Sequence, residues 1–161
     1  VRAMVSDAAG TLWVATRGGL ARRSGASWHL DSSGDWLDQE GLLGLARHPD
    51  GGVWLASAVG IYRSQGSVFA PVVHRGEEYP GGRIWSIGAS DGNTIWLAAE
   101  NEGFFRFRDG LLERIDLDSG ILDAICVLED NTGSIWVGAF GSGLHRFRAG
   151  PFQCCASRYG W

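Results

Sequence analysis

The segment GSIWVGAFGSGLHRF, residues 133–147, carries glycines in a pattern that could bind the phosphates of a dinucleotide. Such a site needs a helix that begins directly behind the glycines, so that the N–H groups of its first turn face the anion. The residues that follow are LHRFRAGPF, and Gly150 and Pro151 would stop a helix there. The segment therefore predicts a hairpin turn, and no cofactor is expected.

Four arginines could together bind an anion. Each ends a Gly-apolar-x-Arg segment, and they are Arg22, Arg63, Arg106 and Arg146. Because these segments recur at regular intervals, we expect the arginines on equivalent strands, one in each repeat. On this basis we favour a structural role, in which each arginine pairs with a turn carboxylate or covers a sheet edge. An anion site is the alternative.

Residue types suited to hydrolysis or metal binding are present but scattered. A hydrolytic site needs two carboxylates, or a nucleophile and a base, that converge in one cleft. The acidic pair Glu77 and Glu78 lies beside Tyr79 in a polar segment. The histidines share no metal-ligand spacing; they are His29, His48, His74 and His145. The cysteines are odd in number and form no CxxC pair; they are Cys126, Cys154 and Cys155. The sequence indicates neither an enzyme nor a metal site.

An internal repeat of about 40 residues organises the whole chain. Each copy is anchored by a tryptophan between two aliphatic residues, and the anchors are Trp13, Trp54, Trp96 and Trp136. Successive anchors lie 41, 42 and 40 residues apart. A small residue follows each anchor by two positions, and one of the four arginine segments comes next. So many matching positions in four copies indicate a true repeat.

Each repeat holds four short apolar segments separated by Gly, Asp and Asn turns, without helical periodicity. Four strands in such a repeat are typical of a β-propeller blade. We therefore predict an all-β propeller segment of four consecutive four-stranded antiparallel blades, at residues 1–38, 39–80, 81–120 and 121–161. In the first repeat the strands are predicted near 1–6, 11–16, 19–24 and 27–31, and the other repeats follow by the same offsets.

Three columns of the repeat fit this architecture. The predicted innermost strand carries a small residue where the blades crowd together: Ala3, Gly44, Ser86 and Cys126. The anchor tryptophan on the second strand is predicted to fill the gap between neighbouring blades. A turn in each repeat contains an aspartate, and these are Asp7, Asp50, Asp91 and Asp130. We expect their carboxylates to accept turn N–H groups. The turns resemble the Asp-box hairpin of sialidases, and they lack calcium-loop spacing.

The residues DAAGTLWVATRGGLAR, 7–22, resemble the two-component regulator propeller repeat almost throughout, and 130–146 match nearly as well. Repeats two and three depart from it by shortened Asp turns, and the resemblance covers essentially the whole chain. It implies a bacterial extracytoplasmic, periplasmic sensor with usually seven blades in a ring. A membrane-crossing segment then leads to a histidine kinase or a diguanylate cyclase. The resemblance implies no fixed catalytic residues, and it implies ligands that are often saccharides.

Composition and charge limit the partners. The net charge is -4 and the basic residues are scattered, so no nucleic acid is expected. No apolar run approaches the roughly 18–20 residues of a membrane span, so no direct membrane contact is expected in this segment. The chain opens on VRAMVSD, which indicates a piece of a longer protein. We expect part of a larger ring, because an open four-bladed arc would expose strand edges and apolar faces. The alternative is a closed four-bladed ring, and the resemblance implies about seven blades.

A ligand site is predicted where the repeats differ, in the loops that would ring one face of the propeller. Aromatic groups beside polar groups at a concave rim suit sugar-like or peptide-like ligands. The candidates are Arg17, Trp36, Glu78, Tyr79, Trp85, Glu100, Asn101 and Phe140. The alternative is that they are ordinary loop and core residues.

The first functional hypothesis is a non-catalytic, ligand-sensing propeller segment of a bacterial signal-transduction receptor. Its expected partners are a small ligand such as a saccharide, the remaining blades and a membrane-linked signalling domain, with a possible dimer in the full receptor. The alternatives are a protein-interaction scaffold and, third, an enzyme of the sialidase or lyase type. All three share the propeller fold, and the fold does not decide between them.

Overall fold

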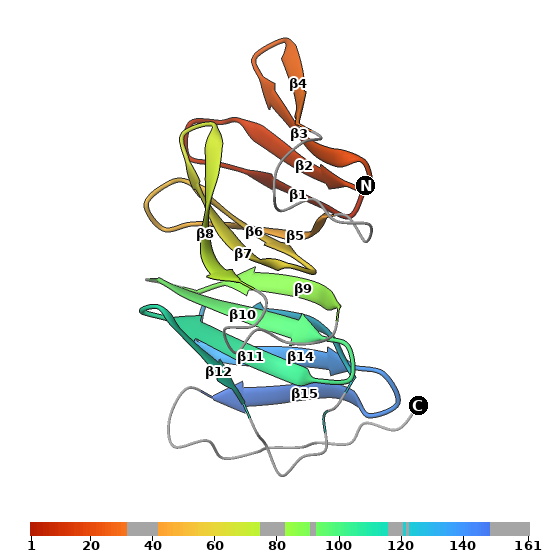
Figure 1. The fold of residues 1–161 in the computed structure, drawn as a ribbon. Helices are drawn as coiled ribbons and strands as arrows, with labels where there is room; N and C mark the ends of the chain where they lie inside the picture. Colours follow the sequence, from red (N-terminus) through yellow and green to blue (C-terminus); the bar gives the residue numbers. More distant parts are fainter. Residues whose placement is uncertain (32–41, 75–82, 91–92, 116–120, 122, 149–161) are drawn as a thin grey trace. The chain divides into compact units, whose positions relative to one another are not determined.

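The computed structural model describes residues 1–31, 42–74, 83–90, 93–115, 121 and 123–148. The described residues form fifteen β-strands and no helix (Figure 1). The chain divides into two compact units, Val1–Ile84 and Trp85–Trp161.

Two four-stranded antiparallel sheets make up the first unit. Each is a meander in which strands consecutive in the sequence are hydrogen-bonded neighbours. The first sheet contains β1 (Ala3–Ser6), β2 (Leu12–Thr16), β3 (Gly19–Ser24) and β4 (Ser27–Asp31). The second contains β5 (Leu42–Arg47), β6 (Val53–Ser57), β7 (Gly60–Gln65) and β8 (Val68–His74). The strands of the first sheet lie within the four ranges that the sequence predicts.

The second unit repeats this arrangement. One sheet contains β9 (Ile84–Ala89), β10 (Thr94–Ala99), β11 (Gly103–Arg108) and β12 (Leu111–Arg114). The other contains β13 (Ala124–Glu129), β14 (Ser134–Ala139) and β15 (Gly143–Arg148). The fourth strand predicted for this last sheet, near Phe152, lies outside the described residues.

Strand pairing gives every anchor tryptophan the same neighbour. The register places each anchor directly opposite the arginine of its own repeat: Trp13 opposite Arg22, Trp54 opposite Arg63, Trp96 opposite Arg106 and Trp136 opposite Arg146. Residues that are directly opposite in an antiparallel pair point to the same face of the sheet. Each sheet therefore has one face that carries the tryptophan and the arginine, called here its Trp face.

In the first unit, the Trp face of the first sheet packs on the second sheet. Trp13 and Leu20 form a buried cluster with Leu45, Val53 and Leu55. The ring of Phe69 on β8 meets Trp13 edge to face, with 5.4 Å between centroids. The anchor tryptophan thus fills the space between two sheets, as the sequence predicts.

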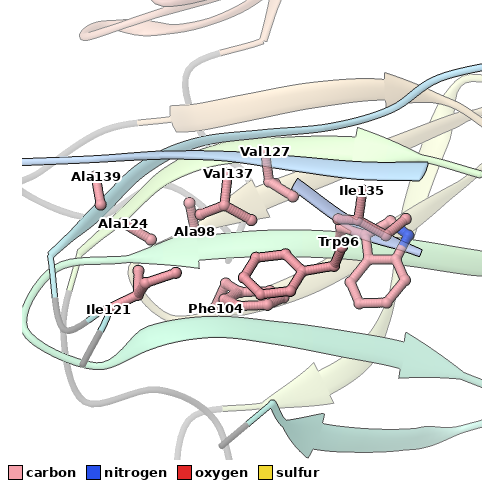
Figure 2. Packing of buried hydrophobic residues seen from close by; sticks show 10 residues of the cluster. Trp96, Ala98, Phe104, Ile121, Ala124, Val127, Ile135, Val137 and Ala139 are labelled. Atoms are coloured by element: carbon pink, nitrogen blue, oxygen red, sulfur yellow. The ribbon is translucent and has the colours of Figure 1, made fainter. Parts of the chain in front are cut away.

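In the second unit, the Trp face of the β9–β12 sheet packs on the β13–β15 sheet (Figure 2). Trp96 and Phe104 lie on one side of this core, and Val127, Ile135 and Val137 lie on the other. The Phe104 ring also lies 5.4 Å from that of Phe147, centroid to centroid. The same face of one sheet is therefore covered by the following sheet in both units.

Glycines permit two close approaches in the second unit. Gly103 has φ 81°, and a Cβ atom there would lie 2.7 Å from the carbonyl oxygen of Ile121. A Cβ atom on Gly138 would lie 2.5 Å from Sγ of Cys126, its cross-strand neighbour. Gly103 therefore needs glycine, because the backbone before β13 lies directly against it, whereas a side chain at Gly138 would require Cys126 to move.

Candidate functional site

The turn aspartates of repeats one and four bind the anchor tryptophans. Asp7 accepts hydrogen bonds from the backbone N–H of Thr11 (2.8 Å) and from the indole Nε1 of Trp13 (2.9 Å). Asp130 accepts from the backbone N–H of Ser134 (3.0 Å) and from Nε1 of Trp136 (2.7 Å). One carboxylate thus closes the turn and fixes the ring that follows it, which is a structural role.

These hydrogen bonds favour the ionised carboxylates. Burial by itself would raise the pKa of Asp7, but the indole of Trp13 and the N–H of Thr11 outweigh it and lower the pKa below its ordinary value. Hydrogen bonds from the hydroxyl of Thr132, the indole of Trp136 and the N–H of Ser134 lower the pKa of Asp130 further. Both groups are therefore anions near neutral pH.

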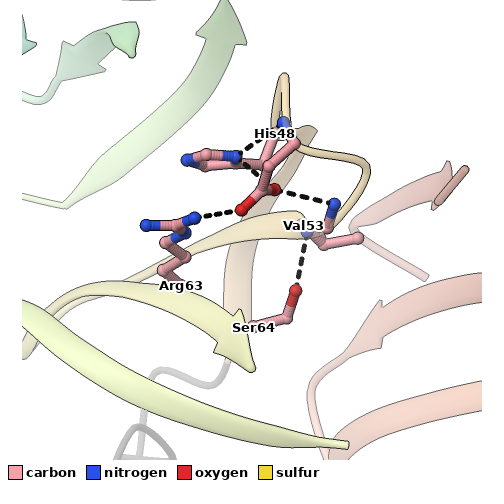
Figure 3. A network of polar contacts seen from close by, with 6 residues as sticks. His48, Val53, Arg63 and Ser64 are labelled. Atoms are coloured by element: carbon pink, nitrogen blue, oxygen red, sulfur yellow. Dashed lines mark hydrogen bonds and ion pairs between the residues drawn. The ribbon is translucent and has the colours of Figure 1, made fainter. Parts of the chain in front are cut away.

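Repeat two uses its turn aspartate differently (Figure 3). Asp50 accepts a hydrogen bond from the N–H of Gly52 (3.0 Å) and pairs with Arg63 and with the buried His48. Burial would raise the pKa of Asp50, but the Gly52 N–H and Arg63 outweigh it and lower that pKa. Ser64 accepts the N–H of Val53 at 2.7 Å, which ties β7 to the start of β6.

In repeat three the indole of Trp96 donates to Glu129 at 2.9 Å, across to the following sheet. Asp91, the turn aspartate of that repeat, lies outside the described residues. Sequence reasoning missed Glu129, because its contact depends on how one sheet packs on the next.

The four repeat arginines have different partners. Arg63 pairs with Asp50, and Arg106 pairs with Glu113 on β12, with Nε 3.1 Å from Oε2. Arg146 lies 5.2 Å from the centroid of the Trp136 ring and donates to Ser134 at 2.9 Å.

Arg22 differs from these three, because its hydrogen-bond partner is the hydroxyl of Ser67 at 3.0 Å. Each arginine thus has contacts within its own sheet or to the next one. None of these contacts brings the four arginines together as an anion cluster.

Three of the predicted rim residues lie in two turns of the second unit. Phe140 stands in the β14–β15 turn with 78% of its surface exposed, and Glu100 and Asn101 form the β10–β11 turn. The residues before β13 lie beside both turns, because Phe140 donates its N–H to the carbonyl of Asp123 (2.9 Å) and Gly103 lies against Ile121. These two turns therefore share one end of the unit.

The other predicted rim residues are placed separately or not described. Trp85 is on β9 and is 37% exposed. Arg17 is an exposed residue of the β2–β3 turn in the first unit. Trp36, Glu78 and Tyr79 lie outside the described residues. A ligand site at the rim stays a prediction.

Neither a metal site nor a membrane-spanning helix is found in the part of the chain that the structure describes. No group of three or more His, Cys, Asp or Glu side chains there could hold a metal ion. No helix there is long and apolar enough to cross a membrane. Cys126 is a free, exposed thiol, and Cys154 and Cys155 lie outside the described ranges.

No protein-family profile and no curated protein sequence matches the chain. Among solved structures, the chain is similar to virginiamycin B lyase from Staphylococcus aureus, with a TM-score of 0.77 and 13% identity over 94% of this chain and 53% of that one. The chain thus spans about half the length of this lyase.

Two further solved structures are similar to the chain. One is the extracellular domain of BT4673 from B. thetaiotaomicron, described as a hybrid two component system, with a TM-score of 0.69 and 16% identity over 97% of this chain and 21% of that one. The other is the gluconolactonase XC5397 from Xanthomonas campestris, with a TM-score of 0.63 and 18% identity over 94% and 60%.

These similarities establish the fold. The chain is an all-β propeller segment of antiparallel blades, as the repeat predicts. The resemblance to two-component regulator propeller repeats is confirmed at the level of the fold, because sensor propellers of hybrid two-component systems are among the similar structures. Propeller enzymes are similar to the chain as well.

Proposed function

We propose that residues 1–161 form blades of an extracytoplasmic, ligand-sensing propeller in a bacterial signal-transduction receptor, and that this segment is not catalytic. The observation that carries the proposal is the fourfold repeat with its two-component propeller motif, folded like the extracellular domain of BT4673. In such a receptor, ligand binding biases a kinase or cyclase domain across the membrane, and dimerisation would couple two such domains.

An uncovered Trp face supports a ring larger than these four blades. The Trp faces that carry Trp13 and Trp96 are each covered by the following sheet. The matching face of the β13–β15 sheet leaves Leu128 61% and Leu144 59% exposed. This apolar surface is of the kind that a further blade covers within each unit.

The rim at the β10–β11 and β14–β15 turns is the proposed ligand contact in the second unit. The exposed ring of Phe140 can stack on the apolar face of a sugar. The polar groups of Glu100 and Asn101 in the other turn can bind its hydroxyls. We propose a saccharide as the ligand class on this basis.

An enzymatic function is the second candidate. Virginiamycin B lyase has a higher TM-score than the BT4673 domain, and the gluconolactonase shows a further propeller enzyme with a similar fold. A scaffold that binds other proteins is the third candidate, since propellers offer large rigid surfaces.

A thermal-shift screen of the chain against oligosaccharides tests the proposal, with mass spectrometry of each ligand after incubation. The proposal predicts a ligand that raises the Tm and is recovered unchanged. Phe140→Ala should abolish the shift, whereas Leu128→Ala, a change of an exposed apolar side chain on β13 away from the β14–β15 turn, should keep it. Recovery of a cleaved or isomerised ligand would favour the enzymatic candidate. A shift that survives Phe140→Ala would contradict the proposed site.

A further inference from the structure

A cavity of about 170 Å³ lies between the two sheets of the first unit, beside the Trp face of the first sheet. The lining residues are apolar on one side and polar on the other: Trp13, Leu20, Leu30 and Phe69, and Arg22, His29 and Ser67. The two aromatic rings meet edge to face and leave apolar surface toward the cavity. A cavity of roughly 150 Å³ is enough for benzene, so one ring or a short branched chain fits here.

The polar side of this cavity carries hydrogen-bond donors and the positive charge of Arg22. Arg22 donates from Nη1 to the hydroxyl of Ser67 at 3.0 Å. Among the described residues, no carboxylate pairs with its guanidinium. His29, directly opposite Arg22 in the strand register, offers a further ring nitrogen.

The third repeat differs from the first in the residue that lies opposite the repeat arginine. There the register places Glu113 directly opposite the repeat arginine, and its carboxylate pairs with Arg106 at 3.1 Å from Nε. The first repeat has His29 at the matching position opposite Arg22. The first repeat thus has a histidine, not a carboxylate, opposite its arginine, and a cavity lies at the same place.

We propose that this cavity binds a small organic acid, a monocarboxylate whose apolar part is no larger than one ring. The ligand's carboxylate takes the position that Glu113 has in the third repeat and accepts hydrogen bonds from Arg22. Ser67 and His29 provide further donors, and the apolar part packs on Trp13, Leu20 and Phe69. This site is separate from the rim and does not depend on the proposed sensing of saccharides.

Calorimetric titration of the chain at neutral pH and low salt tests this site, with benzoate as the probe and benzamide as its neutral isostere. Benzoate should bind saturably with one site per chain. Benzamide should bind at least about tenfold more weakly, because it lacks the charge that faces Arg22. Equal affinities, or no saturable binding of benzoate at millimolar concentrations, would overturn the proposal.

Three variants locate the site. Arg22→Gln should abolish benzoate binding, whereas Arg23→Gln, the same change on the neighbouring residue outside the cavity lining, should leave it unchanged. His29→Glu restores the carboxylate of the third repeat; it should pair with Arg22 and abolish binding without lowering the Tm. Binding of benzoate by folded Arg22→Gln or His29→Glu protein as tightly as by the unchanged chain would contradict the site. A rise in Tm caused by a saccharide at the rim should persist in all three variants. Failure of the organic-acid site therefore does not contradict the proposed function, which the thermal-shift screen tests separately.

Discussion

At the scale of single residues, the spacing between aspartate and tryptophan decides whether the two side chains meet. Asp7 and Asp130 each stand six residues before the anchor tryptophan, and both accept its indole N–H. Asp50 stands only four residues before Trp54 and pairs with Arg63 instead. The longer turn is needed to bring the carboxylate back over the ring.

The lowered pKa values of Asp7 and Asp130 predict a loss of stability in acid. A carboxyl whose pKa is lowered by folding stabilises the protein above its unfolded pKa of about 3.9, and this contribution is lost as the pH falls through the folded value. The Tm should therefore fall as the pH drops from about 5 toward 2. Scanning calorimetry across this range measures the effect.

The double variant Asp7→Asn, Asp130→Asn should have a lower Tm at neutral pH and a smaller further loss in acid. Asp109→Asn, a change of an exposed carboxyl outside these turns, serves as the control and should keep the acid profile of the unchanged chain. An acid profile that is the same in the double variant and in the unchanged chain would show that these turns do not stabilise the fold through their charge.

Several residue roles followed from the sequence, and others needed the fold. The tryptophan anchors and the Asp turns are local patterns, so their spacing predicted them. The contact of Trp96 with Glu129 joins residues 33 positions apart, and the cavity beside Arg22 depends on two sheets. Neither is encoded by spacing within one repeat.

At the scale of strands and sheets, the turns made the strand positions predictable. Each hairpin is bounded by glycine or by polar turn residues; Gly19, for example, begins β3 with φ 138°, and Gly103 begins β11 with φ 81°. The sequence predicted that each anchor tryptophan lies between two sheets, but it did not show that Trp96 is fully covered and Trp136 only half-buried. That property depends on the neighbouring sheet and not on the strand itself.

Two substitutions at equivalent positions of the repeat, Trp96→Ala and Trp136→Ala, should lower the free energy of unfolding by unequal amounts. Trp96 is 4% exposed between two sheets, whereas Trp136, at the same column, is half-buried on a sheet face with exposed neighbours. Trp96→Ala should lower the free energy of unfolding by about 3–5 kcal/mol, the usual cost of emptying such a site. Trp136→Ala should cost clearly less.

Urea denaturation followed by circular dichroism measures both variants. Both tryptophans donate an indole hydrogen bond to a carboxylate, so the comparison isolates the covering sheet. Equal losses for the two variants would contradict the uncovered face of the β13–β15 sheet.

At the scale of the whole molecule, the repeat specifies blades but not the ring. Each unit pairs two sheets through the same kind of face, and the chain covers 53% of the lyase and 21% of the BT4673 chain. The spacing of the repeats does not encode how many blades close a ring, so four repeats alone could not predict that number. The fold is likewise shared by sensors and enzymes, so function depends on the rim, the cavity and the domains attached to the propeller.

Determination of the complete coding sequence that contains residues 1–161 is the most direct test of the proposal that they belong to a signal-transduction receptor. We predict a secretion signal, further repeats with tryptophan anchors about 40 residues apart, and a membrane-spanning segment followed by a histidine kinase or diguanylate cyclase domain. A coding sequence for a secreted protein with no membrane-spanning segment and no kinase or cyclase domain would contradict it.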